Sequence, residues 1–583
     1  MFRRTGAALF FLLPMVLSSA WSMAQAYGGT LLYRSAEAGR FTPSPSVQTE
    51  VHINVTGIVA RTSVRQKFVN PSDKQGNWTE ATYVFPLPDG AAVDHLRMVV
   101  GERVIEGQIK ERGEAKTFYQ QAKQRGQRAS LLEQERSNIF TTSVANIGPG
   151  ERITVEIQYQ ETLRFDGGRF QLRFPMVVGP RYIPGVPVTV EGQGRQGTGT
   201  SADTDRVPDA ARLTPPVLPP KQGLINPVSL SITLLPGFPL GAVASPSHEI
   251  IDLADGDGRH HIALKEGTAP ADRDFLLIWR PAEGATPTAT ILSEQRDGET
   301  YALMLVMPPA QPQSGAPLPR DVTFVIDTSG SMAGTSIEQA KVALAQAPRR
   351  LFTIGIGSAP NSHLMRKAAQ FGYGTFTAIV SLTEGKERLD DLFRKLERPL
   401  WTHLSLDHSG WEEQESYPPR LPDLYDGEPL MLAVKARTIP TQLSLQGRMG
   451  ERRWSLPVTT ARAEPTSGLS VLWAREKIAS LMDDKVMGTP EEDIRRAVLA
   501  VALAHHLVSA YSSLVAVDVT PAKPIDTTLT SRILATNLPD GQEYRAIFGL
   551  PSTATDGRLR LLIGCSSLAL ACLGWMLLRR CTT

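Results

Sequence analysis

The sequence predicts a multidomain, mainly β protein with one small α/β (Rossmann-like) domain, two helices near the C-terminus and one transmembrane helix. Three observations lead to this prediction. The 583 residues are enough for several domains with separate cores. Most segments alternate apolar and polar residues at the period of two that is typical of half-buried strands. One central strand is instead continuously apolar and runs into a polar loop and an amphipathic helix, which indicates an α/β sheet.

The charge balance does not point to a nucleic-acid or acidic partner. The formal net charge is +2, so composition gives no reason to expect a nucleic-acid partner or an acidic substrate.

The three cysteines, Cys565, Cys572 and Cys581, all lie at the far C-terminus. The rest of the chain must therefore be held together by its apolar cores, without disulfides.

Residues 1–26 have the pattern of a secretory signal peptide. Two arginines precede an apolar core at residues 7–17, and Ala24 and Ala26 give the small-x-small pattern of a cleavage site. We therefore expect the chain to be exported, with the mature protein starting near Tyr27. Large exported domains without disulfides are typical of bacteria.

Residues 45–165 are predicted to form a β-rich domain with one inserted helix. Residues 152–159 alternate apolar and polar side chains, as in a half-buried strand. The segment 111–125 is polar on most of its surface and is expected to be helical. Asp94 and His95 are adjacent in the chain, and we interpret them as surface residues rather than as a catalytic pair.

This domain closely resembles the VIT domain, the N-terminal module of inter-alpha-trypsin inhibitor heavy chains. The resemblance rests on three stretches: YVFPLPDGAAVDHLRM, GERVIEGQIKERGEAKTFYQQA and SNIFTTSVANIGPGERITVEIQY. It covers well over a hundred residues.

Residues 191–224 are rich in Gly, Pro, Ser and Thr and are interpreted as a linker or a long mobile loop. Strand-like alternation returns in a β-rich segment at 225–305. Within it, Asp255 and Asp257 could suggest a calcium site, but the other ligand positions of an EF-hand loop are absent. A hairpin turn fits this DGDG stretch better. The two histidines that follow should point to opposite faces of a strand.

The segment 321–380 contains the only stretch that points to a specific chemistry. An apolar strand ends in a loop that carries Asp327, Ser329 and Ser331, and a helix with a capping-box start follows. The loop therefore lies at the carboxyl end of a strand, where α/β sheets bind ligands. One carboxylate and two hydroxyls suit Mg2+ or another divalent cation. The alternative is an Asx-type turn that only prepares the helix start.

This stretch resembles the von Willebrand factor type A domain, whose metal-ion-dependent adhesion site begins with DxSxS. Asp327, Ser329 and Ser331 match that motif. In the family, a carboxylate from the partner protein completes the metal's coordination, and a threonine and an aspartate from two later loops complete the site. Here Ala347 is followed directly by what looks like the family's late strand, helix and last strand. The resemblance therefore implies a truncated domain with an incomplete metal site.

Residues 385–460 again alternate short strands and turns. A helical segment is expected at 466–518. Its first helix covers 469–481, and its second starts at Pro490 with an apolar stripe that extends to Val508. Proteins that combine VIT and A-type domains carry a similar C-terminal part, which ends in a segment like YSSLVAVD.

The last residues predict the location of the protein. Residues 561–578 are uncharged, are followed by two arginines and are just long enough for a transmembrane helix, with the bulk of the chain outside. An LPSTA motif precedes this span, formed by Leu550, Pro551, Ser552, Thr553 and Ala554. At 550–554, before an apolar span and a basic tail, the motif resembles a sortase sorting signal, which implies cleavage after Thr553. A juxtamembrane spacer is the alternative. The whole arrangement resembles the sortase target proteins of marine proteobacteria.

The sequence therefore predicts a bacterial, exported, single-pass protein of the cell envelope that a sortase processes and that binds another protein or a matrix. Its expected partners are a sortase, a protein or extracellular-matrix ligand, and the membrane. One alternative is a structural or assembly protein with a metal-free A-type domain. A weaker alternative is a secreted hydrolase. No GxSxG elbow, HExxH helix or cysteine nucleophile occurs in the exported part, so we expect no enzymatic activity.

Overall fold

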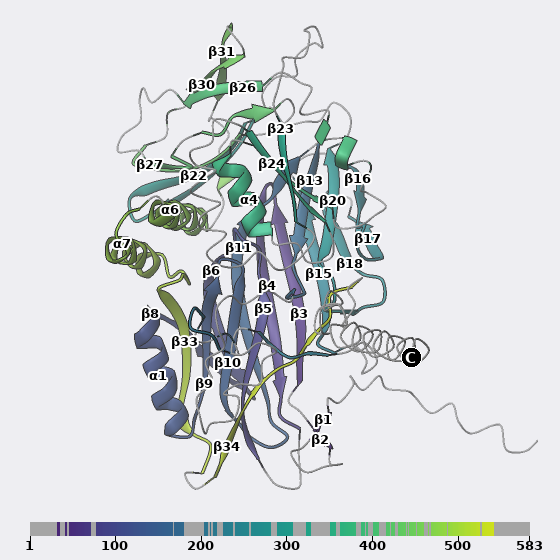
Figure 1. The fold of residues 1–583 in the computed structure, drawn as a ribbon, viewed down its shortest axis with the longest axis vertical. Helices are drawn as coiled ribbons and strands as arrows, with labels where there is room; N and C mark the ends of the chain where they lie inside the picture. Colours follow the sequence, from purple (N-terminus) through teal and green to yellow (C-terminus); the bar gives the residue numbers. More distant parts are fainter. Residues whose placement is uncertain are drawn as a thin grey trace, which may run out of the picture.

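The computed structural model describes residues 32–34, 41–43, 46–71, 77–179, 203–281, 289–306, 322–327, 350–379, 386–465 and 468–540, with short gaps inside several of these ranges. Two large sheets dominate it (Figure 1). Side chains from both sheets pack into one apolar core, which includes Phe68 from one sheet and Phe140 from the other. The two sheets thus form a sandwich.

The first sheet has nine strands. Its order along the sheet is β17 (Ile250–Ala254), β18 (His260–Leu264), β15 (Pro227–Leu235), β3 (Ser46–Thr56), β4 (Val59–Val69), β11 (Arg152–Thr162), β6 (Ala92–Val100) and β7 (Arg103–Glu106), and β19 (Ala269–Pro270) also pairs with β15. Alternation decides which face is buried: Val64 and Phe68 of β4 point into the core, while Arg65 between them is only half-buried.

The second sheet has six strands. Its order is β34 (Leu529–Ile533), β5 (Trp78–Pro86), β10 (Ile139–Ile147), β9 (Gln127–Arg136), β33 (Ser512–Pro521) and β8 (Gln108–Glu111). Helix α1 (Arg112–Gln124) covers its outer face, as predicted from the polar segment 111–125. Glu111 caps this helix, because its carboxylate accepts the Glu114 backbone N–H at 3.0 Å.

Strands from distant parts of the chain complete both sheets. β15 pairs in parallel with β3, β34 pairs in parallel with β5, and β33 lies between β9 and β8. The sequence suggested that the segments 225–305 and 466–518 are separate from the N-terminal domain, but both are part of it. The first contributes β15, β17, β18 and β19 to the sandwich, and the second contributes β33.

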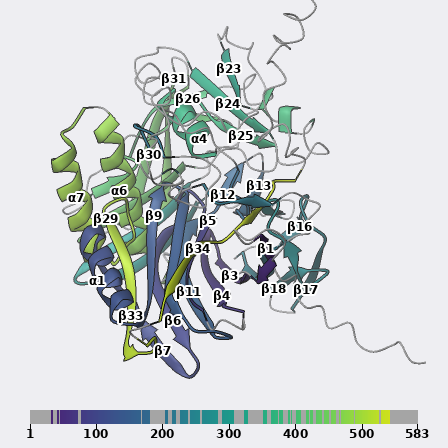
Figure 2. The ribbon, with the colours of Figure 1, turned by 60° about the horizontal axis from the view of Figure 1, so that its bottom comes forward.

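The prediction of a wholly helical segment at 466–518 was wrong at its C-terminal end. Helix α6 (Leu469–Val486) and helix α7 (Glu491–Ala504) are present, but the segment YSSLVAVD lies in strand β33 from its second residue, Ser512, onward. The apolar stripe predicted to reach Val508 stops earlier, because His505 is the C-cap and His506 adopts a left-handed φ of 58°. Figures 1 and 2 show β33 beside α1, with α6 and α7 on the same side of the molecule.

Three smaller sheets flank the sandwich. One has the order β12 (Arg164–Asp166), β13 (Arg169–Phe174), β20 (Phe275–Pro281) and β16 (Leu240–Ala244). The second has the order β27 (Glu415–Tyr417), β29 (Leu430–Ala436), β22 (Glu299–Val306), β21 (Ala289–Arg296) and β32 (Glu464–Pro465). The third has the order β28 (Leu424–Tyr425), β26 (Leu400–Leu406), β30 (Gln442–Met449) and β31 (Arg452–Thr459). The β-rich prediction for 385–460 is thus confirmed.

Two further strand pairs stand apart from these sheets. β1 (Leu32–Arg34) pairs with β2 (Phe41–Pro43), and β14 (Val217–Leu218) pairs in parallel with β35 (Thr536–Asn537). The predicted linker at 191–224 is therefore partly built into the fold: the Val217 side chain is buried, and its strand pairs with residues some three hundred positions later. Residues 191–202 of that linker lie outside the described residues.

The segment 321–380 forms a small parallel sheet. Its order is β23 (Val322–Asp327), β24 (Arg350–Ile356) and β25 (Phe376–Ile379), and helix α4 (Ser362–Phe371) connects the last two strands. Strand β24, helix α4 and strand β25 match the late strand, helix and last strand expected from the sequence. The helix predicted directly after the Asp327 loop lies outside the described residues. In the chain it is inserted between β22 and β26, strands of two different flanking sheets.

No helix in the part of the chain that the structure describes is long and apolar enough to cross a membrane. The predicted signal peptide at 1–26, the sorting motif at 550–554 and the span at 561–578 lie outside the described residues.

Candidate functional site

The structure places Asp327 at the carboxyl end of the small parallel sheet. It is the last residue of β23, and its register partner in β24 is Gly355. The carboxyl ends of β23 and β24 therefore meet at one edge, where α/β sheets bind ligands. Ser329 and Ser331 lie outside the described residues, so the predicted ligand set remains a prediction.

The strand next to Asp327 limits what this edge can offer. β24 ends in Gly355 and Ile356, and neither side chain carries an oxygen. The chain continues into residues 357–361, which lie outside the described residues. Among the described residues, no group of three or more His, Cys, Asp or Glu could hold a metal ion. Any cation here would therefore depend on Asp327 and on loop residues around it.

Buried charges attach the small sheet to the sandwich. Arg366 of helix α4 donates to the Asp89 carboxylate at 2.8 Å, and Asp89 lies in the loop between β5 and β6. Arg475 of α6 donates to the backbone carbonyl of the same Asp89 at 3.0 Å. Lys367 of α4 pairs with Asp483 of α6 at 2.7 Å. One aspartate thus joins α4, α6 and the N-terminal domain.

The electrostatics of this junction reflect its burial. Burial lowers the pKa of the Arg366 guanidinium, and the Asp89 carboxylate opposes that shift. Burial likewise lowers the pKa of Arg475 and raises the pKa of Glu476 beside it. Such charges are costly without partners, so the contacts with Asp89 hold α4 in one position. No local sequence pattern predicts this junction, since its members are far apart in the chain.

An aromatic cluster fixes the two C-terminal helices to the sheet around β22. The Trp473 ring lies 5.6 Å from Tyr301, 5.9 Å from Tyr417 and 5.7 Å from His505, measured between centroids. Burial, with nearby cationic side chains, lowers the pKa of His505 to about 4. The cluster thus packs the C-terminal end of α7 against α6 and β22.

The adjacent pair Asp94 and His95 has no catalytic arrangement. Asp94 accepts a hydrogen bond from Arg61 at 2.7 Å, whereas His95 faces Glu106 at 3.2 Å. Each residue has its own partner, and both side chains are half-buried rather than freely exposed.

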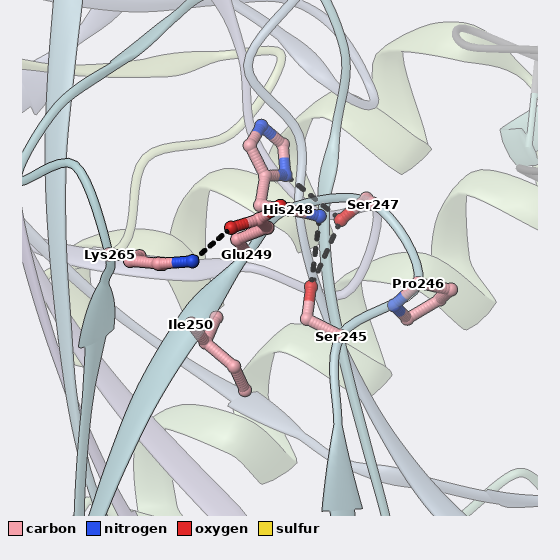
Figure 3. Close-up of a pocket in the computed structure, with 7 residues that line it drawn as sticks. All are labelled: Ser245, Pro246, Ser247, His248, Glu249, Ile250 and Lys265. Atoms are coloured by element: carbon pink, nitrogen blue, oxygen red, sulfur yellow. Dashed lines mark hydrogen bonds and ion pairs between the residues drawn. The ribbon is translucent and has the colours of Figure 1, made fainter.

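A shallow hollow of about 390 Å3 lies along the loop that joins β16 to β17, with Lys265 on its other side (Figure 3). In it, Ser247 Oγ lies 2.9 Å from His248 Nδ1 and accepts the Leu276 backbone N–H at 2.8 Å. Burial, with the charge of Arg273, lowers the pKa of His248 to about 4. Among the described residues, no carboxylate is hydrogen-bonded to this imidazole, and its Nε2 has no hydrogen-bond partner. The pair therefore lacks the third group of a hydrolytic triad.

The DGDG stretch forms the predicted hairpin. β17 and β18 pair antiparallel, and the Asp255 backbone N–H donates to the Arg259 carbonyl at 2.7 Å across the turn. His260 lies 3.0 Å from Asp252, and His261 lies 3.1 Å from Asp255. Two separate pairs result, which matches the expectation that the histidines point to opposite faces.

Comparison with known proteins agrees with the sequence resemblance. Residues 46–159 match the Vault protein inter-alpha-trypsin (VIT) domain. Mouse protein mono-ADP-ribosyltransferase PARP4 is 26% identical over 306 residues, which is 51% of this chain and 14% of the relative. Human von Willebrand factor A domain-containing protein 5A is 29% identical over 143 residues, 24% of this chain and 18% of the relative. Inter-alpha-trypsin inhibitor heavy chain H3 of Pongo abelii is 23% identical over 336 residues, 56% of this chain and 33% of the relative.

The matched region thus spans a third or less of the length of these relatives. Among solved structures, an M1 zinc metallopeptidase from Deinococcus radiodurans is 10% identical, with 54% of this chain and 56% of that chain covered. Its TM-score of 0.17 is too low to indicate a shared fold or a shared activity.

Proposed function

We propose that this chain, a VIT-domain protein related to the von Willebrand factor A domain-containing proteins and the inter-alpha-trypsin inhibitor heavy chains, binds another protein or a matrix through its VIT sandwich and A-type sheet. The observation that supports this most is the position of Asp327 at the carboxyl end of β23. The junction at Asp89 gives that edge a fixed place on the sandwich. A rigid ligand-binding edge is what a selective contact needs.

In this proposal, Asp327 acts together with Ser329 and Ser331 to hold Mg2+ or another divalent cation. A carboxylate and two hydroxyls are hard oxygen ligands, which these cations prefer. A carboxylate from the partner would supply a further ligand. Binding would then need both the cation and an acidic residue on the partner.

The expected result of a thermal melt of the full chain, purified in mild detergent, is a metal-dependent stabilisation. At a Mg2+ or Mn2+ concentration a hundredfold above the dissociation constant, the folded state should gain about 2.7 kcal/mol relative to EDTA. Asp327→Ala should abolish the shift. Asp321→Ala is the matched control, because Asp321 immediately precedes β23, at the other end of the strand, and should leave the shift intact.

A second candidate function is a structural one, with a metal-free A-type sheet. The pairing of β24 directly beside β23 favours it, because no strand lies between them to bring another carboxylate to the edge. In that case the melt shows no shift with either cation. The A-type sheet then acts as a scaffold, and the VIT sandwich carries the binding.

We propose no enzymatic activity for this chain. The mouse relative is named as a transferase, but the match spans only 14% of it. Within the part of the chain that the structure describes, no carboxylate orients the His248 imidazole beside Ser247. A panel of peptide, ester and glycoside substrates tests this: turnover that is lost in Ser247→Ala would contradict it.

The proposed location is the bacterial cell envelope, with residues 561–578 as a single membrane span and a sortase acting at 550–554. Sequence alone supports this. Thr553→Ala should abolish cleavage in cells that carry a sortase, because the enzyme would lose the residue at which it cuts. Ser552→Ala, at the variable position of the motif, should be cleaved normally. The mass of the envelope-bound protein distinguishes the two results, and unchanged processing of Thr553→Ala removes the sortase from the proposal.

A further inference from the structure

We propose that β17, the edge strand of the nine-stranded sheet, is a second binding site, which takes an extended segment of a partner protein that alternates basic and apolar residues. The segment would add a strand to the sheet beside β17. This site lies on the two-sheet sandwich, outside the residues 46–159 that match the VIT domain, and needs no cation. It therefore does not depend on the function proposed for Asp327.

The backbone of β17 is open on one side. Within the described part of the chain, its only strand partner is β18. Lys265 donates its N–H to the Glu249 carbonyl at 3.0 Å, and Asp255 donates its N–H to the Arg259 carbonyl at 2.7 Å. In an antiparallel pair, hydrogen-bonded positions alternate with open ones, so odd-numbered residues bond to β18 and even-numbered residues face outward. The outward N–H and C=O groups belong to Ile250, Asp252 and Ala254.

The side chains of β17 anchor the strand on one face and leave apolar surface on the other. Ile250 packs against the main core of the sandwich. On the opposite face, Ile251 is 45% exposed and Leu253 is 64% exposed. Exposed aliphatic side chains on an open edge are what natural sheets avoid unless another strand covers them. An added strand would cover both.

Charge indicates what kind of strand fits. Residues 249–266 carry five acidic and two basic side chains, a net charge of −3 with neutral histidines. Asp252 lies on the edge itself, between the two exposed aliphatic residues, with His260 3.0 Å away. A basic side chain on the partner would reach Asp252 on one face, while apolar neighbours cover Ile251 and Leu253 on the other. The partner therefore alternates basic and apolar residues.

The same charge argues against a second copy of this chain as the occupant. Two β17 strands paired antiparallel about their centres would place Asp252 opposite its own counterpart. Like charges directly opposite each other in a sheet are destabilising. A single aspartate at the centre thus works against self-association and favours a basic partner.

The hollow in Figure 3 continues the site at the amino end of β17. Its lining runs from Ser245 to Ile250, directly into the strand, and Lys265, which follows the neighbouring strand β18, closes one side. The Glu249 carboxylate accepts from Lys265 at 2.7 Å at its rim. A side chain at the end of the added strand would reach this hollow, which supplies hydroxyl and carboxylate oxygens for a polar group.

The test uses the full chain in mild detergent and three synthetic nonapeptides. The first is acetyl-Thr-Val-Arg-Val-Arg-Val-Arg-Val-Thr-amide, the second replaces each Arg by Glu, and the third is the first with alternate backbone amides methylated. Calorimetry at low salt should show the basic peptide binding at least tenfold more tightly than the acidic one. The methylated peptide should bind at least tenfold more weakly than the basic peptide, because its methylated amides cannot donate hydrogen bonds to the open edge. EDTA should have no effect.

Variants of β17 make the test specific. Asp252→Lys should reverse the preference, so that the acidic peptide binds more tightly. Leu253→Lys should lower the affinity for the basic peptide about tenfold. Val104→Lys is the matched control, because Val104 is also an exposed aliphatic residue, 55% exposed, but lies on β7 at the other edge of the same sheet. It should leave binding unchanged, and the far-UV circular dichroism of all variants should match that of the parent.

Three outcomes overturn the proposal. Equal affinity for the basic and acidic peptides would show that Asp252 does not select the partner. Unchanged affinity for the methylated peptide would show that the peptide does not bind as an added strand. Concentration-dependent dimerisation of the parent that Leu253→Lys abolishes would show that the edge joins two copies of this chain instead.

Discussion

A fragment comprising residues 46–281 is expected to show no cooperative thermal transition on its own, and to regain one when a second fragment, residues 468–540, is added. The reason lies in the six-stranded sheet. β33 sits between β9 and β8, where Leu514 pairs with Leu132 on one side and with Ile109 on the other. Without β33, β9 has an open apolar edge and β8 has no strand partner. β34 is also missing, so β5 becomes an edge.

Helix α1 would lose part of its support as well. Ala115 and Tyr119 of this helix pack into a cluster that includes Val515 of β33. In the full chain, Leu514, Val515 and Ala516 are buried almost completely. An incomplete sandwich of this kind exposes too much apolar surface to fold alone. Circular dichroism melts of the first fragment, with and without the second, measure the effect.

The control for this experiment is the second fragment with Leu514→Asp. An aspartate at this position would bring an unpaired charge into the core, so this fragment should restore no transition. The expectation is wrong if residues 46–281 alone melt cooperatively at the same transition temperature as the full chain. The N-terminal domain would then fold independently, without a stabilising contribution from the C-terminal strands.

Asp89→Ala is expected to lower the free energy of unfolding by about 3 kcal/mol, the lower end of the cost of breaking a buried ion pair. The Asp89 side chain is only 10% exposed and Arg366 is 31% exposed, so the guanidinium would lose its carboxylate in a largely dry place. The partial exposure of Arg366 is why the lower end applies. Chemical denaturation of the full chain measures the change, provided that unfolding remains a single transition.

The same substitution should release the A-type sheet from the sandwich. Limited proteolysis should then cut within residues 322–379 at least tenfold faster than in the parent. Asp390→Ala is the matched control, because its pair with Lys386 is well exposed and contributes little. A loss below about 1 kcal/mol for Asp89→Ala, the range of a surface pair, would mean that the junction is held by other contacts.

Local patterns were enough to predict several elements. The alternation at 152–159 corresponds to β11, the polar segment 111–125 to helix α1, and the DGDG stretch to the β17–β18 hairpin. The apolar run before Asp327 corresponds to β23. These predictions succeeded because a period of two, a capping residue and a short turn act over a few residues and are written in consecutive positions.

The sequence by itself thus determined the type of most elements, the VIT resemblance and the place of Asp327 at a strand end. Only the tertiary structure decided that β33 completes the N-terminal sandwich, that Asp89 joins α4 to α6, and that β17 is an edge strand among the described residues. In each case the partners are distant in the chain, and pairing depends on which edges and faces remain uncovered once the sheets form. A local pattern predicts whether a segment forms a helix or a strand. Burial of complementary surfaces across the whole fold decides which other elements that segment packs against.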